Sequence, residues 1–228
     1  MKEKQFQQSC TYAVLTGDII DSTKLSNSEI HTTWETIKVV VEDFSIIHAD
    51  TFEGGVDFYR GDSWQLLLRK PKYALRLALL IRARIRAEVN IDTRISIGMG
   101  LVNEINENRI SMSQGEAFVL SGHSLDDISG YFAFTGELPK RAGDLRKWFP
   151  VMLFLCSEIV ESWTRRQAEI VSKALLLDKP THSLIAKSLI PVVKKQTVSD
   201  SLRGANWRVL QETIAVFEET NWQKLCAE

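Results

Sequence analysis

Apolar positions in the first 137 residues follow two periods, one typical of strands and one typical of helices. Residues 94–101 alternate apolar and polar side chains, as in a strand with one buried face. Residues 27–44 and 73–88 repeat apolar side chains at helical spacing. The expected elements, in order, are strand 12–16, helix 27–44, strands 51–59 and 63–69, helix 73–88, strand 94–101, helix 115–128 and strand 131–135.

This order of elements predicts an α+β fold. A strand, a helix, two strands, a helix and a strand form the βαββαβ plan of ferredoxin-like domains, and here a further helix and strand follow. The segment 59–62 contains Gly61 and predicts a tight hairpin between the second and third strands. We therefore expect one sheet with its helices on one face.

Residues 138–228 have a different pattern, because β-prone segments are largely absent from them. Apolar spacing there predicts helices over 148–163, 165–177, 181–189 and 196–219. The sequence thus divides into an α+β domain over residues 1–137 and an all-α segment over residues 138–228. No Gly/Ser-rich linker separates the two, which favours segments that pack against each other.

Composition is that of an ordinary globular chain. Of the 228 residues 44% are hydrophobic and 25% are charged, and the formal net charge is −1. No apolar run reaches the roughly 18 residues that a membrane span requires, and the charged N-terminus lacks the apolar region of a signal peptide. We therefore expect a cytoplasmic protein with no membrane partner. Three scattered cysteines predict neither a disulfide framework nor a zinc site.

Charge is distributed unevenly along the chain. Residues 138–228 contain 14 Lys and Arg against 10 Asp and Glu, whereas residues 1–137 contain 14 against 19. This asymmetry suggests two functional segments, of which the C-terminal one is basic. Four arginines of the helix expected over 73–88 lie mainly off its apolar stripe, and we expect them to form a solvated face. They are Arg76, Arg82, Arg84 and Arg86.

Two aspartates stand at the ends of expected strands. Asp18 follows the first strand and Asp62 lies in the hairpin, so their carboxylates are expected to converge near the edge of the sheet. Two close carboxylates repel each other unless a cation lies between them, and oxygen ligands suit Mg²⁺ or Mn²⁺. Either aspartate taken alone is also an ordinary turn residue, because turns favour Asp and Gly.

The residues that follow Asp18 suit a phosphate group. They offer backbone N–H groups and two hydroxyls just before a helix, where anions commonly bind. Together with a metal ion, such residues would form a triphosphate site. The candidate phosphate-binding or nucleotide-binding residues are Ile19, Ile20, Asp21, Ser22 and Thr23, with Arg60 in the hairpin.

Several short motifs between residues 11 and 137 resemble those of class III adenylate and guanylate cyclases in order and spacing. The segment Asp18–Thr23 is similar to their first metal-binding signature, and Arg60-Gly61-Asp62 resembles the Gly-Asp pair that supplies their second metal ligand. Segments 94–100 and 115–118 resemble two later motifs of these enzymes. The nearest resemblance is to the SatD family, bacterial proteins with a C-terminal helix-turn-helix.

The resemblance implies a nucleotide ligand, a metal ion on the two aspartates, and a homodimer, because class III cyclases form their sites across a two-fold interface. It leaves catalysis open. The base-selecting lysine would fall near Phe58 and is missing. The transition-state Asn and Arg would fall near Val119 and Gly122 or His123, and neither is matched. Loss of such a charge-stabilising group commonly costs on the order of 10²–10³ in rate.

Three hypotheses about function follow. The favoured one is a SatD-like regulatory protein, whose degenerate cyclase-like domain binds a metal and a nucleotide and whose tail binds DNA. The first alternative is an active nucleotidyl cyclase that forms a cyclic nucleotide from a nucleoside triphosphate. The second alternative is a non-catalytic scaffold that only dimerises.

The apolar pattern of residues 165–216 predicts a compact unit of three helices. Its pattern around residues 185–202 resembles the core of a helix-turn-helix, with a recognition helix that begins near residue 196. A bundle that only packs or dimerises has the same periodicity, and the connection between the two helices is longer than usual and contains Pro191. Small polar side chains suit base edges and basic ones suit phosphates. The candidate DNA-binding residues are Lys194, Lys195, Gln196, Thr197, Ser199 and Arg203.

Overall fold

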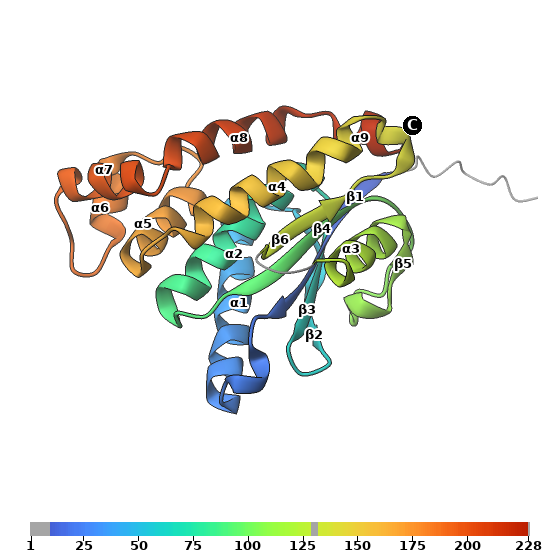
Figure 1. Cartoon of the computed structure of the whole chain (residues 1–228), viewed down its shortest axis with the longest axis horizontal. Helices are drawn as coiled ribbons and strands as arrows, with labels where there is room; N and C mark the ends of the chain where they lie inside the picture. The colour runs from blue at the N-terminus through green and yellow to red at the C-terminus, as the bar shows by residue number, and fades with distance from the viewer. Residues whose placement is uncertain (1–9, 129–131, 228) are drawn as a thin grey trace, which may run out of the picture.

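The computed structural model describes residues 10–128 and 132–227, and Figure 1 shows a central sheet with helices packed around it. The strands are β1 (Thr11–Ile19), β2 (Phe52–Tyr59), β3 (Ser63–Leu68), β4 (Thr93–Glu104), β5 (Gln114–Gly115) and β6 (Phe134–Glu137). The helices are α1 (Asn27–Ile47), α2 (Ala74–Glu88), α3 (Glu116–Asp126), α4 (Leu145–Glu161), α5 (Arg165–Leu176), α6 (His182–Ser188), α7 (Lys195–Gly204), α8 (Trp207–Glu219) and α9 (Trp222–Cys226), with a short 3-10 helix η1 at Ser22–Lys24.

The sheet has the ferredoxin-like order predicted from the sequence. Its strands run β2-β3-β1-β4-β5, and β6 pairs with β4 on the side away from β1. β1 is antiparallel to both β3 and β4, whereas β6 is parallel to β4. The α+β class and the βαββαβ order are therefore confirmed.

Local signals place the first helix and the hairpin. Ser26 caps α1, since its hydroxyl accepts from the N–H of Glu29 while the Glu29 carboxylate accepts from the N–H of Ser26. The turn between β2 and β3 needs positive φ values, which Arg60 and Gly61 adopt at 52° and 88°. The hairpin agrees with the sequence prediction.

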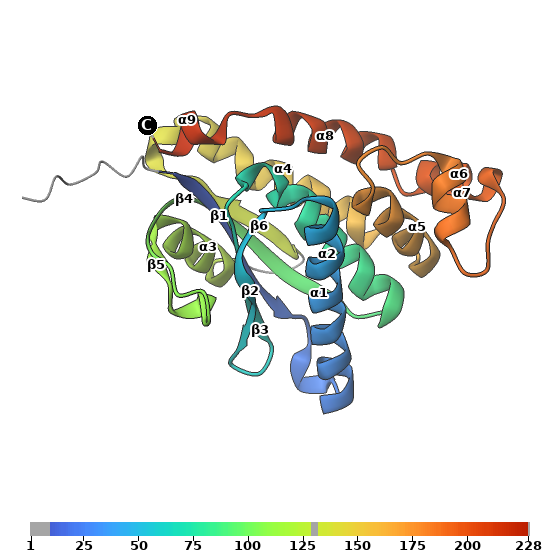
Figure 2. The ribbon, with the colours of Figure 1, turned by 180° about the vertical axis from the view of Figure 1, so that it is seen from behind.

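Helices cover both faces of the sheet, so the expectation of helices on one face is wrong. Ala13 and Leu15 of β1 join a core cluster that includes α1 and α2. Val14, which points the other way, packs with Leu67 and with Ala117 of α3. Figure 2 shows α3 on the opposite side of the sheet from α1 and α2.

Several boundaries differ from the sequence predictions. β1 extends to Ile19, so Asp18 lies inside the strand rather than after it. The single helix expected over 196–219 is divided into α7 and α8, because Asn206 adopts a left-handed conformation with φ 54°. β6 begins at Phe134, and Tyr131 of the expected strand 131–135 is outside the described residues.

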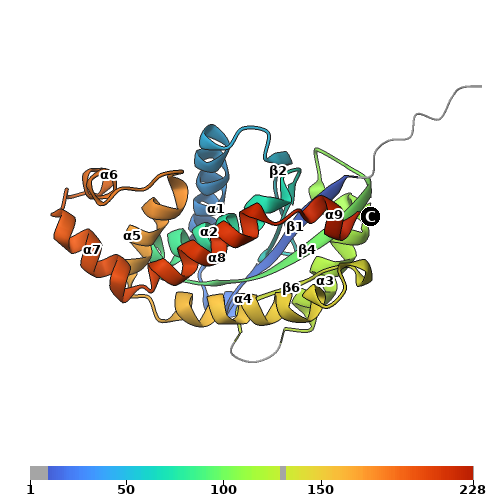
Figure 3. The ribbon, with the colours of Figure 1, turned by 90° about the horizontal axis from the view of Figure 1, so that it is seen from above.

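The C-terminal helices pack directly on the α+β part. One buried cluster runs from β1, α1 and α2 through α4, α5, α7, α8 and α9, and Figure 3 shows α5 and α8 alongside α2. The expectation of packed rather than tethered segments is confirmed. Of the helices in the described part of the chain, none is both long and apolar enough to cross a membrane.

Candidate functional site

A polar cavity of about 720 Å³ lies where β1, β3 and β4 meet α3 and the β2–β3 turn. Three arginines contribute to its walls, each from a different part of the fold. Asp18 and Arg60 are the two residues of the sequence-predicted site that line it. The lining consists of Thr16, Asp18, Tyr59, Arg60, Ser63, Gln65, Arg94, Arg109, Ser111, Gly122, Leu125 and Asp126.

Asp18 forms a bidentate ion pair with Arg94. The Arg94 Nε donates to Asp18 Oδ1 at 2.7 Å, and Nη2 donates to Oδ2 at 2.6 Å. The antiparallel register of β1 and β4 places these two residues directly opposite each other. Both oxygens of the first predicted metal ligand therefore already have a cationic partner.

Asp62 lies close to Asp18 along the backbone, but its carboxylate has other partners. The Ile19 N–H donates to the Asp62 carbonyl at 3.1 Å, so the strand ends meet as expected. The Asp62 carboxylate accepts from the hydroxyl of Ser22 at 2.5 Å and from that of Ser63 at 3.3 Å. Over residues 10–128 and 132–227 no three His, Cys, Asp or Glu side chains cluster as metal ligands would; the Mg²⁺ or Mn²⁺ site stays a prediction.

The segment predicted to hold phosphate lies beside the cavity rather than in its wall. Two of its backbone N–H groups are occupied, since Ile19 donates to Asp62 and Ile20 donates to the carbonyl of Asp92 at 3.0 Å. Asp21 adopts a left-handed conformation with φ 57° and pairs with Lys24 at 3.1 Å. Ser22 and Thr23 belong to η1. A phosphate role for Ile19, Ile20, Asp21, Ser22 and Thr23 stays a prediction.

Arg60 and Arg109 complete the set of cavity arginines. Arg60 is exposed, and no carboxylate of the described residues lies within ion-pair distance of it. The Arg109 Nε lies 3.8 Å from the carboxylate of Asp57, which also accepts from the N–H and hydroxyl of Ser111. Burial raises the pKa of the neighbouring Tyr59, and Arg60 opposes that shift. At neutral pH the Tyr59 hydroxyl is therefore a neutral donor.

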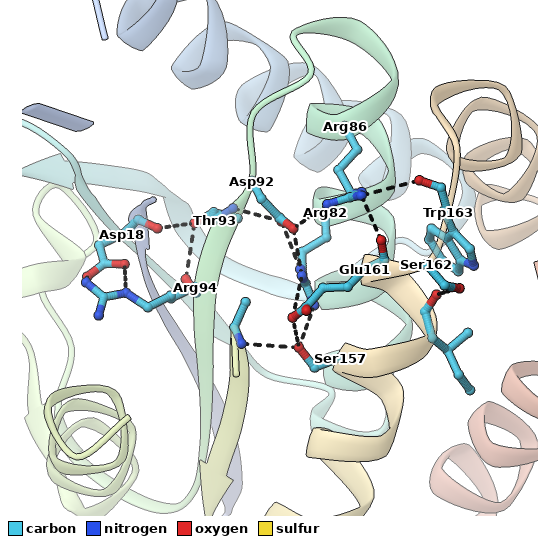
Figure 4. A network of polar contacts seen from close by, with 12 residues as sticks. Asp18, Arg82, Arg86, Asp92, Thr93, Arg94, Ser157, Glu161, Ser162 and Trp163 are labelled. Carbon is cyan, nitrogen blue, oxygen red and sulfur yellow. Dashed lines mark hydrogen bonds and ion pairs between the residues drawn. The ribbon is translucent and has the colours of Figure 1, made fainter. Parts of the chain in front are cut away.

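Polar contacts continue from the cavity into the protein interior, as Figure 4 shows. The Thr93 hydroxyl donates to the Asp18 carbonyl at 2.6 Å and accepts from the indole N–H of Trp64 at 3.0 Å. The Thr93 N–H donates to the Asp92 carboxylate at 2.9 Å. Asp92 in turn accepts from both Arg82 and Arg86. The start of β4 is thus held by side chains of α2.

The four arginines of α2 do not form the solvated face expected from the sequence. Arg82 is completely buried between Asp92 and Ser157. Arg76 makes two hydrogen bonds to Glu218 of α8, at 2.5 and 3.0 Å. Arg84 pairs with Asp43 and Glu88, and Arg86 with Asp92. These arginines link α2 to other parts of the fold. The helical pattern of α2 predicts that they face water, but tertiary packing brings carboxylates of other segments next to them.

Sequence reasoning missed most of the cavity wall. Arg94 lies in one of the cyclase-like motifs, but the motif does not predict its contact with Asp18, which depends on the strand register. Gln65 and Thr16 are joined by a 2.8 Å hydrogen bond across β3 and β1, which the strand periodicity does not predict. Arg109 comes from the β4–β5 connection, far from Asp18 in sequence.

The segment predicted as a recognition helix forms α7. Its candidate residues are exposed, except Ser199, which is half-buried, while Val198 and Leu202 pack inward. Asp200 accepts from Gln196 at 3.0 Å and from Arg203 at 2.7 Å, so one carboxylate sits among the groups expected to meet DNA. DNA binding by Lys194, Lys195, Gln196, Thr197, Ser199 and Arg203 stays a prediction.

Comparisons with known proteins add little to this geometry. No protein-family model matches the chain, and no curated protein matches it. Among solved structures, the chain is similar to the crystal structure of the guanylyl cyclase Cya2, with a TM-score of 0.38 and 17% identity over 54% of this chain and 73% of that chain. Similarity at this level carries no argument about function, and membership of the SatD family stays a prediction.

Proposed function

We propose that the polar cavity binds a small anion that carries phosphate groups, of the nucleotide class, and that the chain is a regulatory binding protein rather than an active cyclase. The observation that carries this proposal is the convergence of Arg60, Arg94 and Arg109 on one cavity. Arginine presents a planar fork of donors that matches phosphate oxygens, which makes it a preferred residue for phosphate recognition.

The size and lining of the cavity support a polar ligand. A volume of about 720 Å³ falls within the range of small-molecule sites. Side chains with hydroxyl, amide and guanidinium groups make up most of the wall. Arg60 is the natural first contact, since it is exposed and has no carboxylate partner in the described part of the chain.

The positions that an active cyclase would use do not support catalysis. Phe58 stands where the base-selecting lysine would fall, and its ring lies 5.2 Å from that of Trp34. Val119 is 52% exposed and offers no polar group. Gly122 lines the cavity but has no side chain to stabilise charge on a phosphoryl group.

Binding is tested by isothermal titration with ATP, GTP and inorganic triphosphate, each with and without Mn²⁺. We expect saturable binding that Arg60→Gln weakens roughly tenfold, which is the loss of one charge-assisted contact. Arg94→Gln should weaken binding at least as much, because it also leaves the carboxylate of Asp18 unpaired in the cavity wall. Arg208→Gln, an exposed arginine of α8, is the matched control and should bind as the parent does. Absence of binding to all three probes would refute the proposal.

The same preparations test for catalysis. After incubation with each nucleoside triphosphate and Mn²⁺, chromatography should detect no cyclic product. Cyclic nucleotide formed by the parent protein, and lost in Asp18→Asn, would instead establish the cyclase alternative.

A second candidate function is DNA binding by α7. It is supported by the exposure of Lys194, Lys195 and Thr197 at the start of a helix whose opposite side is packed on α5 and α6. Gel shifts on DNA from upstream of its own gene, at two salt concentrations, should show affinity that falls as salt rises. The double substitution Lys194→Glu with Lys195→Glu should abolish the shift, whereas Lys224→Glu on α9 should not. A shift that persists in the double variant would exclude this surface.

A further inference from the structure

Gln65 lines the candidate cavity from the middle of β3. The register of β3 on β1 places it directly opposite Thr16. Both side chains belong to the cavity wall, yet Gln65 is only 7% exposed and Thr16 only 4%. The Gln65 amide is therefore a largely buried polar group, for which an unmade hydrogen bond is costly.

A chain of hydrogen bonds fixes which end of the Gln65 amide faces Thr16. Ser121 of α3 donates to the carbonyl of Phe118 at 3.1 Å, and this donation uses the single hydrogen of its hydroxyl. The 2.8 Å contact between the hydroxyls of Thr16 and Ser121 must then be a donation by Thr16. With its own hydrogen used, Thr16 can only accept, so the atom that lies 2.8 Å from it is the amide nitrogen Nε2 of Gln65.

This arrangement leaves part of the Gln65 amide available to a ligand. Within the described part of the chain its side chain makes no other hydrogen bond, so the oxygen Oε1 and one N–H of Nε2 have no partner. The hydroxyls of Ser63 and Ser111, which are also in the cavity wall, already donate to carboxylates. Gln65 is thus an uncharged group of fixed orientation that offers a donor and an acceptor on one amide.

The nearest charged residue in the register of the strands has other partners. Asp57 of β2 stands opposite Gln65 on the side away from β1. Its carboxylate accepts from the N–H and the hydroxyl of Ser111, at 3.0 and 2.6 Å, and lies 3.8 Å from the Nε of Arg109. Asp57 therefore does not take the free N–H of Gln65.

The two free groups of Gln65 suit the edge of a nucleobase better than a phosphate. Nucleobase edges carry N–H donors and ring or carbonyl acceptors next to each other, and glutamine pairs with adenine in this way. A phosphate offers acceptors only, so it would leave Oε1 of Gln65 without a partner at a largely buried position. Phosphate groups have the cavity arginines as partners instead.

We propose that Gln65 is a specificity-determining residue, which holds the base of a nucleotide through an N–H of the base donated to Oε1. This inference rests on the proposed function, since it takes the phosphates of the same ligand to lie at the cavity arginines. Phe58, near which the base-selecting lysine of a cyclase would fall, cannot supply this contact. Its ring lies 5.2 Å from that of Trp34 of α1, on the other face of the sheet.

Isothermal titration of the full chain with ATP, GTP, CTP, UTP and inorganic triphosphate tests the role of Gln65. We expect at least one nucleotide to bind roughly tenfold more tightly than inorganic triphosphate, although the latter carries more charge. Gln65→Met keeps the length of the side chain and removes the amide. It should lower the affinity for that nucleotide to that for inorganic triphosphate, and leave the binding of inorganic triphosphate unchanged. Gln114→Met, at an exposed glutamine of β5, is the matched control and should bind every ligand as the parent does.

The outcomes separate this inference from the proposed function. Binding of no probe would overturn both. Inorganic triphosphate that binds as tightly as every nucleotide would leave a phosphate site and overturn the role of Gln65. An equal loss for all ligands in Gln65→Met would overturn it too, because a merely structural effect does not distinguish between them.

Circular dichroism and the melting temperature check the fold of both variants. If Gln65→Met does not fold, the parent protein still decides the question. Ribose 5-phosphate keeps the sugar and the phosphate of a nucleoside monophosphate but lacks the base, so it should bind more weakly than the best of the four nucleoside monophosphates. Equal affinities would contradict a contact with the base.

Discussion

Arg82 is a charged side chain that is buried in the structure, although the helical pattern of the sequence predicts that it is solvated. Its guanidinium is 0% exposed and donates to both carboxylate oxygens of Asp92, at 2.9 and 2.7 Å, and to the hydroxyl of Ser157. Burial alone would raise the pKa of Asp92, but Arg82, Arg86 and the N–H of Thr93 outweigh it and hold that pKa below its ordinary value. Each buried charge of the pair thus has the other as its partner.

Removing one member of this pair should be costly. Asp92→Asn removes the bidentate counter-ion of the buried Arg82 and leaves only Glu161, 4.0 Å away, and we expect it to lower the free energy of unfolding by about 3 kcal/mol. Urea denaturation at neutral pH measures this. Asp144→Asn, which removes only the exposed partner of Lys147, should unfold at the parent's midpoint. Equal midpoints for all three proteins would contradict the role given to Asp92.

His48 is a second buried titratable residue, at the C-terminal end of α1. It is 5% exposed and its ring lies 4.3 Å from that of Phe44 and 4.5 Å from that of Tyr73. Its Nε2 is 3.4 Å from Asp178 and has no hydrogen-bond partner in the described part of the chain. Burial lowers the pKa of His48 and outweighs the opposing effect of Asp178. The other charged groups that act on it are Arg76, Glu218 and Lys72.

Mild acid should therefore destabilise the protein through His48. Above its ordinary pKa of 6.5 the ring is neutral in both the folded and the unfolded chain. As the pH falls below that value the unfolded chain takes up a proton first, so folding loses stability until the lowered folded pKa is passed. Melting temperatures between about pH 8 and pH 5 should fall less in His48→Gln than in the parent. His182→Gln, at an exposed histidine, should behave as the parent does.

At the scale of elements, α3 is held on the sheet by small and polar residues rather than by a large apolar surface. Its buried residues are Ala117, Ser121 and Ser124. The hydroxyls of Ser121 and Thr16 lie 2.8 Å apart, and those of Ser124 and Thr135 lie 3.0 Å apart. The helix can approach this closely because β4 carries Gly98 beneath it, where an added Cβ would overlap backbone atoms of α3. Because α3 supplies Gly122, Leu125 and Asp126 to the cavity wall, the position at which α3 packs on β4 determines the shape of the candidate site.

A methyl group at Gly98 should displace α3. We expect Gly98→Ala to lower the free energy of unfolding by about 1–3 kcal/mol, the usual cost of overpacking, and to weaken any ligand of the cavity. Gly122→Ala is the matched comparison on α3, where an added Cβ has nothing within 4 Å. It should stabilise the helix by up to about 1 kcal/mol. Chemical denaturation measures both; an unchanged Gly98→Ala would mean that α3 is not tightly seated.

At the scale of the whole molecule, α2 is enclosed on several sides. Besides the predicted stripe it buries Leu75, Leu79 and Ala83, and it lies between the sheet and α5. A helix with apolar side chains on more than one face needs a packing partner on each of those faces, because otherwise one apolar face would be exposed to water. The division at residue 137 therefore separates two sequence patterns that share one core.

A fragment of residues 1–137 should not fold as a stable unit. Without α4, α5 and α8 it would expose the second apolar side of α2 and leave Arg76 and Arg82 without Glu218 and Ser157. We expect non-cooperative thermal unfolding by circular dichroism and strong binding of a hydrophobic dye. The full chain should unfold in a single transition. A soluble fragment with a sharp transition of its own would show that the two segments are independent domains.

Two of the residues proposed from the sequence lie at the cavity, and their roles stay predictions. Asp18 and Arg60 do line the cavity, and the ends of β1 and β3 do meet. The bidentate partner of Asp18 was missed, since Arg94 reaches it only through the register of β4 on β1. The register depends on pairing between strands that are distant in the chain, so a local sequence pattern does not predict it.

Local sequence patterns are enough to predict the order of strands and helices, the βαββαβ plan and the hairpin at Arg60 and Gly61, because periodicity and turn geometry depend on residues a few positions apart. Three features depend on packing between distant segments: α3 lies opposite α1 and α2, Arg82 is buried, and Arg94 pairs with Asp18. Whether a charged or small side chain can be buried at low cost depends on the groups that pack around it, and segments distant in the chain supply those groups.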